Sequence, residues 1–219
     1  MKGAQNLLKI TSLTPPPLYQ LLANNIKQPL IVISNTYDTL LEDTFTNVGK
    51  KYVLISPCIA TNKNNIQIIV KYSDKDKPEF YDFEESLSTL KPLEKEYSLI
   101  YKIRGYFDTR LDKQENQLIL TEENYFAFAY HRDKLIPNYL IGKYADLGFL
   151  FLGYTPKQWE DRLMVDAIWK KHDYFQKNEP SFAIRQNTEP YEIEYWKSCN
   201  IRMHEVELTE FVQKLQEHL

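Results

Sequence analysis

The residues best placed for chemistry follow an apolar run late in the chain. Residues 148–152 read Gly-Phe-Leu-Phe-Leu, and Gly153, Tyr154 and Thr155 come directly after them. Such a run is typical of a parallel strand buried on both faces, and open parallel sheets bind ligands beyond the carboxyl ends of their strands. Glycine lets the backbone approach a ligand closely, and we expect Thr155 to cap a helix that Pro156 begins. The segment predicts a nucleotide-binding loop, although the same pattern occurs where a buried strand simply leads into a helix.

Other groups of reactive or stacking residues have structural explanations. Glu122 and Glu123 follow Thr121, and acidic residues are favoured in the first turn of a helix, so we assign them no hydrolytic role. The aromatic residues at 125–130 have the spacing of a packed helix and no basic stripe beside them, so we expect no nucleic-acid binding. The four histidines have no metal-ligand spacing and no Cys-x-x-Cys motif accompanies them, so we predict no metal site.

The composition is that of a globular protein. The 219 residues are 43% hydrophobic and 26% charged, and the net charge of -3 gives no overall attraction to nucleic acid or anionic lipid. The length suits one sizeable core, so we expect a single α/β domain at 17–219 after a polar lead-in at 1–16. No apolar stretch has the length of a membrane span and no signal-peptide core follows the start, so we expect a cytoplasmic protein without membrane contact. Cys58 and Cys199 lie in dissimilar settings, which favours two buried thiols over a disulfide.

Hydrophobic periodicity predicts the elements that position these residues. Helices are expected at 18–26, 39–48, from 121 through 129, and at 135–144, 156–172, 189–198 and 208–219. Strands are expected at 30–33, 52–55, 66–72, 97–103, 117–120, 148–152, 182–184 and 201–204. Residues 73–96 have no sustained periodicity and predict a surface excursion. The regular alternation of strand and helix in the last third predicts a mainly parallel sheet covered by helices.

Four ordered segments resemble the sirtuin-like domain of bacterial NAD hydrolases. They are 31–42 (IVISNTYDTLLE), 101–105 (YKIRG), 120–125 (LTEENY) and 150–154 (LFLGY). The stretch from 194 to 211 is also similar to the closing helix, strand and helix of that family, so the likeness covers most of the chain from about residue 17 onward. The resemblance implies a Rossmann-like three-layer α/β fold, NAD as cofactor, and a place among antiphage defence proteins that deplete NAD.

The resemblance also implies roles for individual residues. The turn at 153–155 matches the loop that holds a cofactor ribose, and Asp38 matches an acidic residue near the nicotinamide end. Met203 and His204 match a segment that borders the adenine. These residues are therefore the candidate cofactor-binding positions.

Three departures from the family pattern bear on activity. The family's first strand and its glycine-rich turn, which wraps the pyrophosphate, have no counterpart before residue 14. Active members read Thr-Asn-Tyr-Asp or Gln-Asn-Ile-Asp, whereas Asn35 and Thr36 stand in the reverse order, and a one-place shift along a strand turns a side chain to the other face. The family's general base is a histidine before glycine, where this chain has Arg104, whose pKa above about 12 prevents proton acceptance near neutral pH.

These departures predict a degenerate sirtuin-like domain, a pseudoenzyme that serves as a scaffold or subunit and binds NAD weakly or not at all. A missing first strand leaves an open sheet edge, so we expect a protein partner or a homo-oligomer to cover it. The alternative is an NAD glycohydrolase that uses Asn35 or Thr36 and is active only when a partner supplies the glycine-rich half. A third possibility is a sensor that binds nucleotide without turnover. Purely structural roles also stay open, with Asn35 as a helix cap and Arg104 in an ion pair with Asp38 or Asp108.

Overall fold

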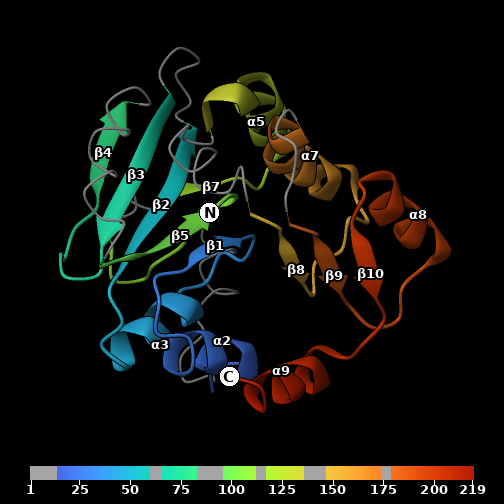
Figure 1. Ribbon diagram of the computed structural model, residues 1–219. Helices are drawn as coiled ribbons and strands as arrows, with labels where there is room; N and C mark the ends of the chain where they lie inside the picture. Colours follow the sequence, from blue (N-terminus) through green and yellow to red (C-terminus); the bar gives the residue numbers. More distant parts are fainter. Residues whose placement is uncertain (1–13, 60–65, 83–95, 112–116, 136–146, 174–178) are drawn as a thin grey trace. The chain divides into compact units, whose positions relative to one another are not determined.

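The computed structural model describes residues 14–59, 66–82, 96–111, 117–135, 147–173 and 179–219 (Figure 1). Contacts divide the chain into two compact units, Met1–Pro137 and Asn138–Leu219. The expectation of a single domain at 17–219 stays a prediction. No described helix is long and apolar enough to cross a membrane.

A five-stranded sheet forms the centre of the first unit. Its strands are β1 (Ile31–Ser34), β2 (Tyr52–Ile59), β3 (Ile66–Tyr72), β4 (Glu79–Asp82) and β5 (Ser98–Lys102). The strand order is β1-β5-β2-β3-β4, in which β1, β5 and β2 run parallel while β3 and β4 are added antiparallel. Because β1 and β5 are parallel neighbours, the segments that follow them emerge at the same end of the sheet.

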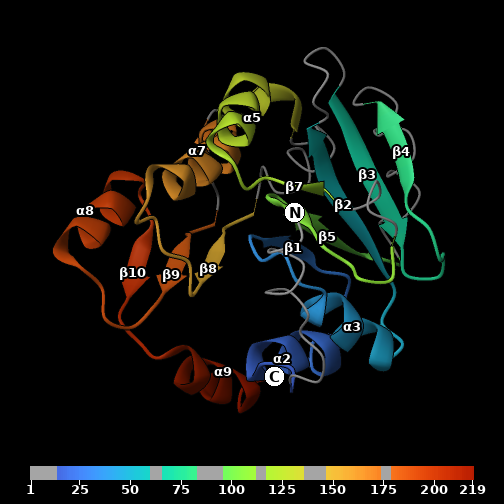
Figure 2. The same cartoon turned by 180° about the vertical axis from the view of Figure 1, so that it is seen from behind.

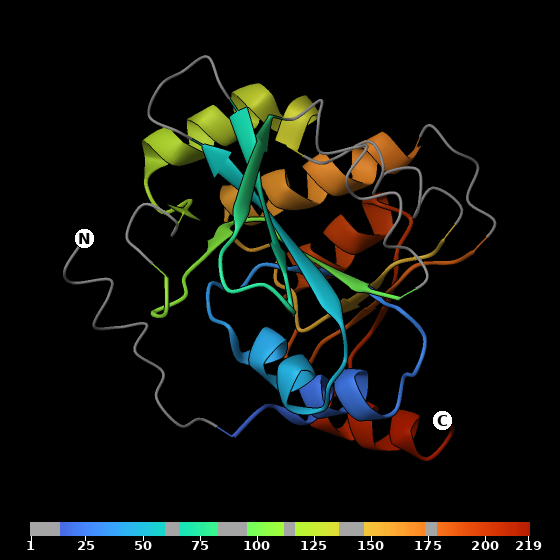
Figure 3. The same cartoon turned by 90° about the vertical axis from the view of Figure 1, so that its left-hand side faces the viewer.

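The helices of the first unit are α2 (Pro17–Asn24), α3 (Leu40–Asn47) and α5 (Glu122–Leu135), and a two-stranded ladder joins β6 (Gly105–Tyr106) to β7 (Gln117–Leu118). Figures 1 and 2 show α2 and α3 side by side, and Figure 3 shows α5 across the ends of β2 and β3. Phe45 of α3 packs against Leu54, Ile69 and Ile100 of the sheet, so the amphipathic helix completes an apolar core.

A three-stranded parallel sheet forms the centre of the second unit. Its strands are β8 (Leu150–Leu152), β9 (Phe182–Ile184) and β10 (Arg202–His204), in the order β10-β9-β8. Its helices are α7 (Trp159–Asp173), α8 (Pro190–Ser198) and α9 (Leu208–Gln216). On one face of the sheet, Val165 of α7 and Trp196 of α8 form a buried cluster with Ala183 and Ile201.

The start of α8 is tied to the sheet through one buried carboxylate. Glu189 and Glu192 form a reciprocal capping box at the first turn, and Pro190 occupies the first helical position. Glu192 also accepts a hydrogen bond from Arg185, which follows β9, at 2.7 Å between Nη1 and Oε1. The helix end and the strand end therefore share a single side chain.

The predicted fold class is confirmed. The chain is mixed α/β with mostly parallel strands, and most helices and strands lie where the periodicity placed them. The predicted helix at 135–144 lies largely outside the described residues. Of the predicted excursion at 73–96, the described part contains β4, so residues 79–82 are an edge strand rather than a loop, because their backbone pairs with β3.

Two details of the segment at 148–159 differ from expectation. The strand β8 is an edge strand of its sheet, and Leu150 is 47% exposed, so the run is not buried on both faces. The following helix begins at Trp159 rather than at Pro156. Asp161 accepts a hydrogen bond from the backbone N–H of Gln158 at 3.1 Å, and this contact, not Thr155, caps the helix.

Candidate functional site

The loop after β1 carries the candidate residues of the first unit and is held by its own polar side chains. Ser34 Oγ lies 3.0 Å from Thr36 Oγ1 and accepts a hydrogen bond from the Thr36 N–H at 3.3 Å. Asp38 accepts a hydrogen bond from the N–H of Leu40, the first residue of α3, at 3.0 Å and so fixes the turn that leads into the helix. The side chain of Asn35 is half-buried. The loop thus has a defined conformation in which Thr36 is engaged internally.

Lys102, the last residue of β5, holds this loop from inside the protein. Its side chain is completely buried, and its ammonium group lies 3.0 Å from Glu42 Oε1. The same group donates to the Asp38 carbonyl oxygen at 2.6 Å and to Thr36 Oγ1 at 3.3 Å. One lysine therefore contacts the loop at two points and the helix α3 at a third.

Glu42 is the buried partner of Lys102. Desolvation raises the pKa of the Glu42 carboxyl above its ordinary value, and the nearby Lys102 charge opposes that rise without cancelling it. Glu42 Oε1 is close to the ammonium group but outside hydrogen-bond geometry, and Oε2 has no hydrogen-bond partner among the described residues. The pair is thus a buried ion pair with incomplete hydrogen bonding, which is costly to build.

Arg104 lies just beyond the end of β5, in the turn that leads to β6. Its guanidinium carbon is 5.8 Å from the centre of the Tyr125 ring, within the range of a cation–π contact. Next to it, Tyr37 donates a hydrogen bond to the Ile119 carbonyl oxygen at 2.8 Å, and burial raises the pKa of the Tyr37 hydroxyl. Arg104, Tyr37 and Tyr125 therefore form one packed group beside the loop after β1.

The turn after β8 is built from Gly153, Tyr154 and Thr155. Gly153 has φ 65°, a left-handed conformation that favours glycine, and its N–H donates to the Ile184 carbonyl oxygen at 3.0 Å. Tyr154 packs its ring near Trp196 and donates its hydroxyl to the Asp161 carbonyl oxygen at 2.7 Å. Thr155 is half-buried in the loop before α7. This positive φ angle is enough to explain why a glycine occupies position 153.

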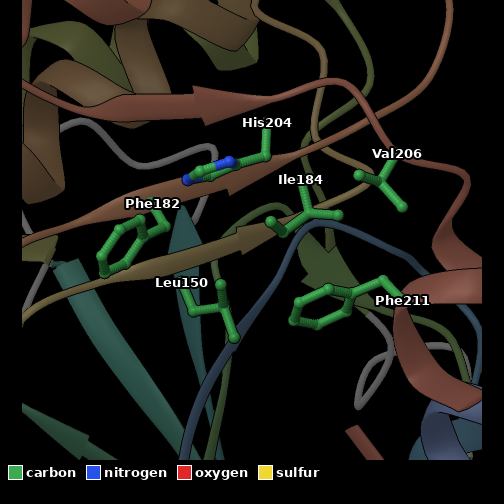
Figure 4. A pocket seen from close by; sticks show the side chains of 6 residues that line it. All are labelled: Leu150, Phe182, Ile184, His204, Val206 and Phe211. Atoms are coloured by element: carbon green, nitrogen blue, oxygen red, sulfur yellow. The ribbon is translucent and has the colours of Figure 1, made fainter. Parts of the chain in front are cut away.

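An apolar pocket of about 330 Å³ lies beside this turn in the second unit (Figure 4). Its lining consists of Leu150, Phe182, Ile184, His204, Val206 and Phe211. The rings of Phe182 and His204 lie 5.8 Å apart and offer flat surfaces of the size of a base or another aromatic group. Met203 is the neighbour of His204 in β10, but it packs against the Trp196 cluster, so of these two residues only His204 lines the pocket.

The structure groups the predicted site residues within each unit. Asn35, Thr36 and Asp38 share the loop after β1, and the neighbouring strand β5 leads into Arg104. In the second unit, backbone hydrogen bonds join Gly153 to Ile184 and Arg185 to His204, so the turn and the end of β10 flank β9. No group of three or more acidic, histidine or cysteine side chains suited to a metal occurs in the described part of the chain.

Sequence reasoning missed Lys102 and Glu42. A signal for Lys102 was present, since it is the one charged residue in the run Ser98–Lys102 and all five residues of that strand are buried. Glu42 gave a weaker signal, because an acidic residue in the first turn of a helix is ordinarily explained by the helix dipole.

Comparison with known proteins gives the family. No curated protein matches the chain. A family model for the SIR2-like domain matches residues 30–204, which is most of the sequence and includes every candidate site residue discussed above. This chain therefore belongs to the SIR2-like domain family.

Proposed function

We propose that this protein is a SIR2-like domain that does not hydrolyse NAD itself and serves as a subunit of a larger assembly. One observation carries the proposal. Arg104 stands where the resemblance puts the family's histidine base, and its guanidinium group packs against Tyr125. An arginine keeps its proton at neutral pH, so it cannot take a proton from water or from a ribose hydroxyl.

The neighbouring loop supports the same proposal. The family pattern expects an amide directly before Tyr37, and that position holds Thr36. The Thr36 hydroxyl already contacts Ser34 and Lys102 inside the protein, so it is occupied by internal hydrogen bonds. Two positions that the family uses for chemistry are therefore filled by side chains with internal contacts.

For the subunit role, the contact we propose is β1, the edge strand of the described five-stranded sheet. The Leu99 N–H donates to the Leu30 carbonyl oxygen at 2.7 Å, and the Ile103 N–H donates to the Ser34 carbonyl oxygen at 3.1 Å. In a parallel pair of strands, every second residue of one strand forms backbone hydrogen bonds with the other strand. Leu30 and Ser34 bond to β5 in this way, so the N–H and C=O groups of Ile31 and Ile33 are directed away from β5. In the described sheet β1 is an edge strand, and a strand from a partner or a second copy would satisfy these groups.

A residual affinity for nucleotides is part of the proposal, and the pocket at His204 supports it. Its apolar lining and the ring pair of Phe182 and His204 suit a stacked base. By contrast, the chain has a single glycine before Gly49, so its residues do not fit the role of a glycine-rich pyrophosphate cradle. We therefore expect adenosine or ADP-ribose to bind weakly through the base, with little contribution from the phosphates.

The deciding experiment is incubation of the purified protein with NAD and measurement of released nicotinamide by chromatography. We expect no release above the blank, both for the protein alone and for its Arg104→Ala variant. Release by the natural protein that the Arg104→Ala substitution abolishes would overturn the proposal. Release that appears only when the products of neighbouring genes are added would instead support the partner-dependent NAD glycohydrolase.

Two further measurements test the assembly. Native mass spectrometry of the protein alone and with the products of neighbouring genes should show a dimer or a hetero-complex, and hydrogen exchange should slow at Ile31 and Ile33 in the complex. A protein that stays monomeric in both settings contradicts the subunit role. From the family resemblance we propose bacterial antiphage defence as the setting, which phage plating on cells with and without the gene tests directly.

A further inference from the structure

We infer that Lys102 is a positioning residue, which sets the conformation of the loop at residues 34–38 from inside the protein and uses Glu42 as its counter-charge. The inference goes beyond the proposed function, because it concerns how the loop is held rather than what it binds. It does not rest on the proposed nucleotide affinity, because Lys102 and the loop belong to the first unit and the pocket at His204 to the second.

The hydrogen bonds of Lys102 carry the argument. A lysine ammonium group has three donors, and the three oxygens around it belong to Thr36, Asp38 and Glu42. Two of these residues lie in the loop, and the third lies one helical turn further on, in α3. Since β5 is the neighbour of β1 in the sheet, Lys102 fixes the loop against a strand whose five residues are all buried.

The arrangement determines which loop side chain is presented outward. Thr36 faces Lys102, and the hydroxyl of Ser34 supports it. Because the Ser34 and Thr36 hydroxyls meet on one side of the segment, we infer that the side chain of Asn35, which lies between them in sequence, is on the side away from Lys102. The side-chain amide of Asn35 makes no hydrogen bond with the described residues and is half-buried, so it is available at the end of β1. Lys102 thus selects Asn35, rather than Thr36, as the residue that a ligand would meet.

Stability alone gives little reason for a charged pair at this position. Removing two charges from water is expensive, and a buried pair can be replaced by apolar residues of similar volume with little loss of stability. The free-energy cost of burying this pair is high because Glu42 Oε2 has no hydrogen-bond partner among the described residues. What an apolar pair cannot replace is the set of directed donors to the Asp38 carbonyl oxygen and the Thr36 hydroxyl.

The test separates stability from loop positioning by comparing a single with a double variant. Lys102→Met removes the donors and leaves the Glu42 carboxylate buried, so the unfolding midpoint should fall. Adding Glu42→Leu should bring the midpoint back toward that of the natural protein. Hydrogen exchange at the Thr36 and Leu40 N–H groups, which donate to Ser34 Oγ and Asp38 Oδ1, reports on the loop itself. We expect exchange there to be faster by about tenfold in both variants, the size of one lost hydrogen bond.

A double variant that recovers both the midpoint and the slow exchange would overturn the inference, and so would a Lys102→Met protein with unchanged exchange. If the double variant does not fold, Glu42→Gln takes its place in the test, because its side-chain amide keeps an oxygen near Lys102. Exchange at the Thr36 and Leu40 N–H groups should then stay slow in Glu42→Gln and be fast in Lys102→Met. Arg185→Met is the matched control. It breaks a different ion pair with a buried carboxylate, that of Glu192, and should leave exchange at Thr36 and Leu40 unchanged.

Because exchange is measured without ligand, a protein that binds no nucleotide at all leaves the inference testable and counts only against the proposed nucleotide affinity.

Discussion

The substitution Gly148→Ala should unfold the second unit at a much lower temperature, and the structure shows why. A Cβ atom built on Gly148 would lie 2.2 Å from the Pro180 carbonyl oxygen and 3.0 Å from its carbonyl carbon. Both atoms belong to the backbone, so no side-chain rotation relieves the overlap. The chain can escape only if one backbone segment moves by about 1 Å.

Both segments are anchored next to the contact. The Phe149 N–H donates to Ser181 Oγ at 2.9 Å, and the Phe182 N–H donates to the Phe149 carbonyl oxygen at 2.8 Å. Moving either segment strains these bonds and the pairing of β8 with β9. Overpacking of this kind costs about 1–3 kcal/mol, and two fixed backbones argue for the upper end. In a unit of this size, about 3 kcal/mol corresponds to a melting temperature lower by roughly 12–24 °C.

Tryptophan fluorescence is a selective assay for this prediction. Trp159, Trp169 and Trp196 are the only tryptophans of the sequence, and all three belong to the second unit. Thermal or urea unfolding followed at tryptophan-selective excitation therefore reports that unit, whereas far-ultraviolet circular dichroism reports both. In Gly148→Ala the midpoint of the thermal fluorescence transition should be lower by roughly 12–24 °C.

Gly49→Ala is the control. Gly49 has φ 71° and no atom within 4 Å of the added methyl group, so the change costs about 1–2 kcal/mol of backbone strain, in the first unit. Its fluorescence transition should not move. A Gly148→Ala protein that unfolds within about 0.5 kcal/mol of the natural protein would refute the reasoning, since surface changes alone have effects of that size.

Three further outcomes are expected. Burial favours a raised pKa for Asp108, but its hydrogen bonds from Arg110 and the charges of Arg110 and Lys71 outweigh that effect and lower the pKa. Ionised Asp108 therefore stabilises the first unit above about pH 4 and loses this effect as the pH falls, so Asp108→Asn should flatten the acid side of a stability–pH curve from urea unfolding. Trp196→Ala should lower the free energy of unfolding of the second unit by about 3–5 kcal/mol, measured by circular dichroism, because the ring is almost completely buried. Burial raises the pKa of the Cys58 thiol to about 11, so mass spectrometry after alkylation at neutral pH should find Cys58 modified only in unfolded protein.

The elements of the last third were predictable because their signals are local. Residues 189–198 combine an acidic cap, a proline at the first helical position and apolar spacing, and the helix α8 is confirmed there. The strands at 182–184 and 201–204 are likewise confirmed as β9 and within one residue as β10. Periodicity and capping act over a few residues, which is the range that sequence patterns report.

The missed features depend on contacts distant in sequence. The ion pair of Lys102 with Glu42 spans two elements that meet only because β5 is inserted between β1 and β2. The strand β4 has mixed polarity and is specified by its pairing with β3. The start of α7 depends on Asp161, whose capping role a residue pattern centred on Thr155 and Pro156 does not reveal.

The carboxylate of Glu192 has a consequence for how the second unit unfolds. Helix ends ordinarily fray first, since their N–H groups lack partners within the helix. In α8 the same side chain that accepts the backbone N–H of Glu189 also binds Arg185 beyond β9, so the first turn cannot open without breaking an ion pair at the sheet. The helix terminus and the strand end are thereby joined into one cooperative unit. Amides at the start of α8 should exchange by the same opening event as those of β9, as a single foldon.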